Sequence, residues 1–147
     1  MSGMIGQYQG PRKQDWATPQ GFFDALDAEF HFTLDPCCLP ETAKCERFFT
    51  PDEDGLTQDW SGEVVFMNPP YGRETAKWMQ KALDESRRGA TVVCLVVSRT
   101  DTAWWHDIAM QGEIRFIRNR LYFEQGGIGR RAPFASAIVI FRPIPLD

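Results

Sequence analysis

Two continuous apolar runs stand out along the chain, at residues 64–67 and 92–97. Neither run alternates with polar residues, which is typical of strands that are buried on both faces of a parallel sheet. Between them, residues 75–88 carry apolar side chains at helical spacing, and Gly89 follows as a helix stop. The pattern predicts a strand, a helix and a second strand, joined by a right-handed crossover.

The amino-terminal third predicts a helix followed by a short strand. Thr18 stands before a proline, which is typical of a helix start with threonine as the N-cap, and aromatic residues recur near the helical period over residues 22–30. Apolar and polar residues then alternate over residues 30–34, which indicates a short strand that ends at Asp35. Residues 37–60 show no period, so we expect them to be mostly loop.

The carboxyl-terminal third predicts a short helix and two more strands. Asp101 or Thr102 can cap a helix that runs to Met110. Residues 114–123 and 135–141 are strand-like, and the short glycine- and arginine-rich loop between them predicts that they pair antiparallel. We therefore expect an α/β fold with a mainly parallel sheet, an antiparallel carboxyl-terminal strand pair, and ligands at the carboxyl ends of the strands.

The length of 147 residues suits one domain, which we place at residues 15–147 after a loose, flexible arm at residues 1–14. No apolar run approaches the roughly 18–20 residues of a membrane span, and the amino terminus lacks the layout of a signal peptide. We therefore expect no membrane contact and a cytoplasmic location. The four cysteines lack zinc-ligand spacing, so we expect reduced thiols and no metal.

Charge is distributed unevenly, although the net charge is only −4. Residues 1–86 hold seven Lys and Arg against fifteen Asp and Glu, whereas residues 87–142 hold nine Arg against four acids. Because electrostatic fields are local, a basic face can bind phosphate groups on a protein that is acidic overall. The basic half is therefore either a nucleic-acid contact or an arginine-rich surface exposed to solvent.

The most informative motif is Asn68-Pro69-Pro70-Tyr71, directly after the first buried run. The two prolines hold the residues before them in extended conformations and remove two backbone donors, so carbonyl oxygens here are free to accept. The Asn68 side-chain oxygen and the Pro69 carbonyl can each take one N–H of an aromatic amino group, which directs the nitrogen lone pair towards a methyl donor. Taken alone, the motif is also compatible with an ordinary turn.

Several further motifs occur in order along the chain. The blocks are Trp16-Ala17-Thr18-Pro19, Leu34-Asp35, Asp54-Gly55-Leu56 with Trp60, Asn68-Pro69-Pro70-Tyr71-Gly72, Ser98-Arg99-Thr100-Asp101-Thr102 and Ala132-Pro133-Phe134. In these blocks the chain resembles the phage-type DNA N6-adenine methyltransferases, the Dam-like group, over nearly its whole length. The resemblance implies a truncated Rossmann-like methyltransferase sheet, S-adenosylmethionine as the cofactor, DNA as the partner and, for a phage protein, the host cytoplasm as the location.

The resemblance also implies a cofactor site drawn from four of these blocks: Trp16, Thr18, Pro19, Asp35, Asp54 and Asn68. Asp35 matches a contact to the methionyl part of the cofactor, where a carboxylate can pair with the ammonium group. Asp54 matches an adenosyl contact. Each has an ordinary interpretation as well, since Asp35 can be a turn former, Asp54 part of a solvated acidic turn, and Thr18 only a helix cap.

For the substrate, the resemblance implies that Asn68-Pro69-Pro70-Tyr71 holds an adenine flipped out of the DNA helix, with Tyr71 stacking on the base. Arg99 follows the second buried run and can hold a phosphate or the flipped nucleotide, or form a surface ion pair. Arg130 and Arg131 lie in the glycine-rich loop and are candidate DNA contacts, either to phosphate or to guanine.

Two departures from the usual methyltransferase pattern limit the prediction. The glycine-rich turn expected after the first strand is replaced by Pro36-Cys37-Cys38, which puts a close backbone approach to the cofactor in doubt there. From Asp35 to Asn68 there are only 33 positions, too few for two further strand–helix units or an inserted target-recognition domain. We therefore expect modest sequence specificity, or specificity carried elsewhere.

The leading hypothesis is a site-specific or low-specificity DNA adenine-N6 methyltransferase. One alternative is an amino or amide N-methyltransferase that acts on RNA or on a protein glutamine. Another is a catalytically inactive DNA-binding module that retains the fold. The sequence leaves the recognition site, the strand preference and the oligomeric state open.

Overall fold

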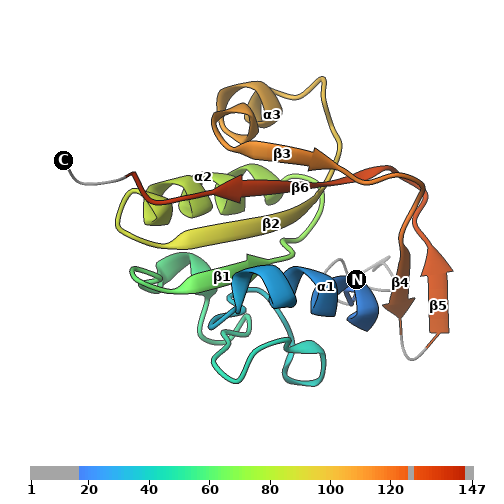
Figure 1. Cartoon of the computed structure of the whole chain (residues 1–147), viewed down its shortest axis with the longest axis horizontal. Helices are drawn as coiled ribbons and strands as arrows, with labels where there is room; N and C mark the ends of the chain where they lie inside the picture. Colours follow the sequence, from blue (N-terminus) through green and yellow to red (C-terminus); the bar gives the residue numbers. More distant parts are fainter. Residues whose placement is uncertain (1–16, 126–127, 145–147) are drawn as a thin grey trace, which may run out of the picture.

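The computed structural model describes residues 17–125 and 128–144. The arm expected at residues 1–14 and the cofactor residue expected at Trp16 lie outside these ranges. In the described part, a four-stranded sheet is covered on both faces, and a two-stranded hairpin stands beyond one end of it (Figure 1). No helix in these ranges is both long enough and apolar enough to cross a bilayer.

The predicted strand–helix–strand unit is confirmed. β1 spans Val64–Met67, α2 spans Thr75–Ser86 and β2 spans Thr91–Val97. The two strands pair in parallel, with Met67 beside Cys94. Both strands are almost wholly buried, as expected from continuous apolar runs that have protein on both faces.

The sheet has the order β1-β2-β6-β3, with β3 at Glu113–Phe116 and β6 at Ser136–Phe141. β6 lies between β2 and β3 and runs antiparallel to both, so the predicted antiparallel pair is confirmed. The expectation of a mainly parallel sheet is wrong, because only β1 and β2 pair in parallel within these four strands. A fully buried apolar run occurs in parallel and in antiparallel sheets, so it does not predict which pairing forms. β6 is such a run, and it pairs antiparallel with both of its neighbours.

The segment from Ile114 to Phe123 is not one strand. It divides into β3 and β4 (Tyr122–Gln125), separated by a polar stretch in which Asn119 has φ = 66°, a left-handed conformation that ends the ladder. The predicted loop 124–133 is also corrected, because β5 (Ile128–Arg131) pairs antiparallel with β4 to form the hairpin.

The amino-terminal prediction is confirmed in outline and corrected at the cap. α1 spans Gln20–Phe30 and is preceded by Pro19 as its N-cap, without a side-chain cap bond, so Thr18 does not cap the helix. His31 ends α1 in a left-handed conformation. The predicted strand is reduced to single parallel bridges that place Leu34 beside β1 and Asp35 beside the following loop.

The remaining described elements are short. Thr102 caps α3 (Ala103–Asp107) by accepting from the Trp105 amide, as one of the two predicted caps, and the 3-10 turn η4 (Ala109–Gln111) follows. The loop between Asp35 and β1 contains two further 3-10 turns, η2 (Pro40–Thr42) and η3 (Gly55–Thr57). This agrees with the prediction that the segment lacks long elements.

Two clusters of buried side chains hold these layers together. On one face of the sheet, α2, α3 and the Trp60 region pack against alternate residues of β1, β2 and β6. On the other face, aromatic residues of α1 pack against the remaining strand residues and against Phe123 of the hairpin. Both clusters reach the corner between β1 and α2, because Met67 belongs to the first and Tyr71 to the second.

Candidate active site

The corner between β1 and α2 has a fixed backbone. Residues 68–71 follow β1 directly, and Gly72 then adopts φ = 107°, a conformation that residues with side chains rarely tolerate. The Thr75 hydroxyl donates to the Pro70 carbonyl at 2.8 Å and so ties the corner to the first turn of α2. Among the described residues, no donor reaches the Pro69 carbonyl, which therefore keeps its acceptor capacity.

Two hydroxyl groups hold the Asn68 side-chain amide. The Tyr71 hydroxyl donates to Asn68 Oδ1 at 2.7 Å, and Asn68 Nδ2 donates to Thr18 Oγ1 at 3.1 Å. Thr18 is only 2% exposed, so its hydroxyl is a fixed acceptor, whereas Asn68 is half-buried. Because an amide oxygen has two lone pairs, Oδ1 can accept a second donor while it remains bonded to Tyr71.

Tyr71 is enclosed by aromatic residues. Its ring packs nearly perpendicular to Phe134 at 5.3 Å and to Phe123 at 6.3 Å between ring centroids, and the residue is 8% exposed. Burial raises the pKa of the Tyr71 hydroxyl, which therefore remains a protonated donor to Asn68. Phe123 and Phe134 connect the hairpin region to the corner, a contact that the sequence alone did not predict.

Asp35 lies beneath the loop that follows it. Its carboxylate accepts from the backbone N–H groups of Lys44 at 3.0 Å and Cys37 at 3.3 Å, and the residue is 3% exposed. Burial raises the pKa of this carboxyl to about 7, although the two N–H bonds favour the charged form. Asp35 thus closes the loop 36–44 and carries a carboxyl group that titrates near neutrality.

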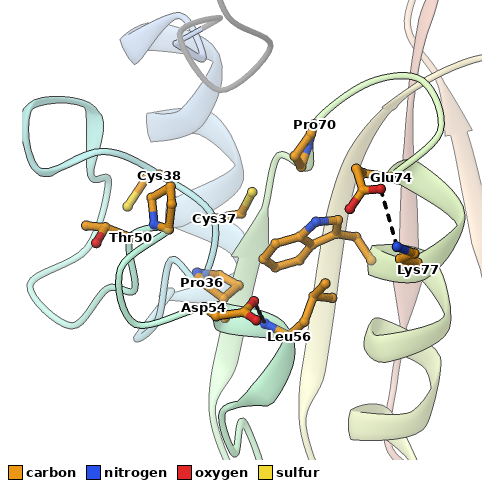
Figure 2. A pocket seen from close by; sticks show the side chains of 12 residues that line it. Pro36, Cys37, Cys38, Thr50, Asp54, Leu56, Pro70, Glu74 and Lys77 are labelled. Atoms are coloured by element: carbon orange, nitrogen blue, oxygen red, sulfur yellow. Dashed lines mark hydrogen bonds and ion pairs between the residues drawn. The ribbon is translucent and has the colours of Figure 1, made fainter.

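A pocket of about 360 Å³ opens beside the corner. Its lining comes from the segment after Asp35, from η3, from the corner and from one side of α2: Pro36, Cys37, Cys38, Thr50, Pro51, Asp54, Gly55, Leu56, Pro70, Glu74, Lys77 and Trp78. Figure 2 shows Pro36 and Asp54 on one side and Glu74 and Lys77 on the other. The pocket therefore joins three of the motifs that the sequence singled out.

The wall around Gly55 is tightly packed. A Cβ atom added to Gly55 would lie 2.1 Å from the Pro36 carbonyl oxygen and 3.0 Å from the Trp78 ring. The Gly55 carbonyl accepts from the Trp60 indole N–H at 3.0 Å, and Trp60 stacks on Trp78 at 6.3 Å. Only glycine fits at this position.

Asp54 directly precedes Gly55 and lines the same pocket. It has φ = 56°, and its carboxylate accepts from the Leu56 amide at 3.1 Å, so it caps η3. The residue is exposed and lines the pocket, whereas the other predicted cofactor residues that the structure describes (Thr18, Pro19, Asp35 and Asn68) are not among its lining residues. The sequence did not point to Glu74 or Trp78, which take their place in the pocket through the packing of α2 against η3.

The predicted DNA-binding arginines lie at the same end of the sheet. Arg99 follows β2 and is exposed. Arg130 and Arg131 are exposed on β5, where neighbouring residues point to opposite faces. Arg130 pairs with the buried Phe123, which packs near Tyr71, whereas Arg131 pairs with Tyr122, which is 61% exposed. Arg130 is therefore on the face of the hairpin that is turned towards the corner.

Comparison with known proteins places this site in a family. The family described as DNA N-6-adenine-methyltransferase (Dam) matches residues 7–145, which include the corner, the pocket and the hairpin. The chain belongs to the Dam family. This confirms the resemblance drawn from the sequence motifs.

Two phage proteins are similar to this chain. The DNA N-6-adenine-methyltransferase of Haemophilus phage HP1 is 31% identical over 111 residues, covering 73% of this chain and 64% of that protein. The protein of the same name from Escherichia phage T1 is 26% identical over 106 residues, covering 67% of this chain and 44% of that protein. The chain thus spans less than two thirds of the length of either relative.

Proposed function

We propose that this Dam-family chain transfers a methyl group from S-adenosylmethionine to the N6 amino group of adenine in DNA. The observation that carries the proposal is the Asn68 amide, which two hydroxyls fix at the carboxyl end of β1. Directly beside it, Pro70 lines a pocket of about 360 Å³. Family membership and the names of the two phage relatives support the same reaction.

The pocket has walls that suit an adenosyl group. Its volume lies within the range of roughly 300–1,000 Å³ that is typical of small-molecule sites. The Trp78 ring, Leu56 and Pro36 provide an apolar surface for a purine, and the Asp54 carboxylate provides an acceptor for hydroxyl groups. When bound, S-adenosylmethionine supplies a methyl group that its sulfonium charge has already activated.

Asp35 is the residue that we assign to the ammonium end of the cofactor. It stands directly before Pro36, the first residue of the pocket lining. Its carboxyl is largely neutral below about pH 7, and a cation placed beside it would favour the ionised form. We also assign Thr18 and Pro19 to the cofactor site, supported by the bond between the Thr18 hydroxyl and Asn68 beside the pocket.

In the reaction, Asn68 Oδ1 accepts one N–H of the target amino group and the Pro69 carbonyl accepts the other. These two bonds draw the nitrogen lone pair out of conjugation with the ring and direct it towards the methyl group. The Tyr71 hydroxyl and Thr18 keep the Asn68 amide in the required orientation. Alignment of this kind can lower the barrier by roughly 7–11 kcal/mol.

The target adenine must leave the double helix to reach this corner. There the base stacks on Tyr71. Because the Tyr71 ring is enclosed by Phe134, the base either contacts the exposed edge of the tyrosine ring or displaces Phe134. Arg99, Arg130 and Arg131 are the residues that we assign to the DNA backbone, since all three are exposed around the same end of the sheet.

The experiment that tests the proposal is transfer of a labelled methyl group to unmethylated DNA, followed by digestion to nucleosides. We expect the label on N6-methyladenine. RNA and a glutamine-containing protein serve as competing substrates in parallel reactions. Label on RNA or protein alone would move the enzyme to another substrate class, and DNA binding without any transfer would indicate an inactive binding module.

A further inference from the structure

A second pocket, of about 400 Å³, borders the same corner but shares no lining residue with the pocket that Pro70 lines. Tyr71 and Arg73 border it on the corner, Arg99 and Thr102 follow β2, and Trp104 belongs to α3. The two pockets therefore share the segment between β1 and α2 as a common wall. A ligand in the second pocket would therefore lie close to a ligand in the first.

The second pocket carries an unneutralised positive charge. Arg73 and Arg99 are both exposed, and neither forms an ion pair with any residue that the structure describes. No acidic residue lines this pocket, whereas Asp54 and Glu74 line the first one. The charges on the two sides of the corner are thus suited to different ligands, with an anion favoured beside the arginines.

Near β3, by contrast, two arginines form ion pairs. There, Arg115 pairs with Glu29 at 2.7 Å and Arg142 pairs with Glu113 at 2.5 Å. Among the described residues, Arg73 and Arg99 form no such ion pair, although Glu74 is the neighbour of Arg73 in the sequence.

The pocket also has an aromatic wall. Trp104 is half-buried, packs against Trp105 at 5.8 Å between ring centroids, and contributes to the second pocket. Thr102 caps the helix that carries it, so the indole has a fixed support. A flat aromatic ring beside two guanidinium groups is the combination by which proteins bind single-stranded nucleic acid, through stacking and phosphate contacts.

We propose that this pocket binds the nucleotide next to the target adenine in the strand that is methylated. Its phosphate lies between Arg73 and Arg99, and its base stacks on Trp104. The inference rests on the proposed function, because it takes the strand entering the corner to be DNA. It adds a site for the flanking nucleotide to the predicted contacts at Arg99 and on the hairpin.

The test is binding of a fluorescent single-stranded oligonucleotide containing one adenine, measured by anisotropy over a range of salt concentrations. We expect Arg73→Ala and Arg99→Ala to weaken binding and each to reduce the salt slope by about 0.7, the value for one phosphate contact on a single strand. Arg99→Lys retains the charge and should retain the slope. Trp104→Leu should weaken binding by about 5-fold or more without a change of slope.

Arg87→Ala is the matched control, because Arg87 is an exposed arginine at the other end of α2 and its side chain bonds only to Gln111 among the described residues. It should leave both the affinity and the slope unchanged. An unchanged slope in Arg73→Ala and Arg99→Ala would overturn the proposal. So would an equal effect of Arg87→Ala, since that would show a general charge effect.

Methyl transfer separates the two proposals. If the protein methylates adenine but the arginine variants bind the oligonucleotide like the unaltered protein, the pocket proposal fails and the proposed function stands. If the salt slope of the variants decreases as predicted but no methyl group reaches adenine, the proposed function fails and the nucleotide site stands. Melting temperatures close to that of the unaltered protein show that each variant is folded.

Discussion

The Tyr71 hydroxyl donates a hydrogen bond of 2.7 Å to the side-chain oxygen of Asn68. The two residues stand at the ends of one tetrapeptide, and the prolines between them leave the backbone little freedom to separate them. The bond gives the tyrosine a role as the group that orients the amide. The role of the hydroxyl can be tested apart from that of the ring, because a substitution can remove the hydroxyl alone.

Tyr71→Phe removes the hydroxyl and keeps the ring. A hydrogen bond of this kind contributes about 1 kcal/mol, so we expect the single-turnover rate of methyl transfer to fall roughly 5-fold or more, with little change in the affinity for S-adenosylmethionine. Tyr122→Phe is the control, because Tyr122 is 61% exposed on the hairpin. Equal rates in the two variants would exclude the orienting role.

Thr18→Val keeps the shape of the side chain but removes the acceptor of Asn68 Nδ2. Loss of a buried hydrogen-bond partner costs about 1–3 kcal/mol, so we expect both a lower melting temperature and a lower kcat. Thr18→Ser restores the hydroxyl and should recover most of kcat. Failure of the serine variant to recover activity would mean that the methyl group of Thr18, rather than its hydroxyl, is what the corner needs.

Gly55→Ala tests the pocket wall. The added methyl group would collide with the Pro36 carbonyl and displace Trp78, so we expect at least a 10-fold loss of affinity for S-adenosylmethionine in calorimetry, or a clear loss of stability. Gly21→Ala is the control, because a Cβ there meets nothing within 4 Å and lies in α1. The pocket assignment is contradicted by a folded Gly55→Ala protein that binds the cofactor normally.

Asp35 predicts a pH dependence of stability. Its pKa is raised from 3.8 to about 7 in the folded protein, so the folded state retains this proton longer than the unfolded chain. The stabilisation is complete below about pH 4 and is lost as the pH rises to about 7. One pKa unit corresponds to about 1.4 kcal/mol, so between pH 5 and 8 the protein should lose roughly 3 kcal/mol relative to Asp35→Asn. Urea unfolding at the two pH values measures this, and parallel pH dependence in both proteins would contradict it.

The sequence predicted the elements whose signals are local. The apolar runs at β1 and β2 and the helical spacing of α2 specify buried strands and an amphipathic helix without reference to the rest of the chain. The motif at residues 68–71 was placed correctly, because it follows a strand that could be recognised by itself. The cap at Thr102 belongs to the same class of local signal.

What could not be predicted depends on contacts between distant segments. The order of β6 and β3 follows from which strand pairs with which, and apolar runs look alike in parallel and antiparallel sheets. Thr18 resembles a helix cap, yet its hydroxyl is used by a residue 50 positions away. From the sequence, Trp78 is only one of the apolar residues of α2. Its place in the pocket wall depends on the packing of η3 against that helix.

The role of the Asn68 amide is tested by single-turnover methyl transfer in Asn68→Ala, with the affinity for S-adenosylmethionine measured on the same protein. Removal of the amide oxygen from the transition state should lower the rate by about 100-fold or more, similar to the loss of one oxyanion-hole donor from an active site. Cofactor affinity should remain within about 3-fold. A folded Asn68→Ala protein that methylates adenine at the full rate would contradict the central claim.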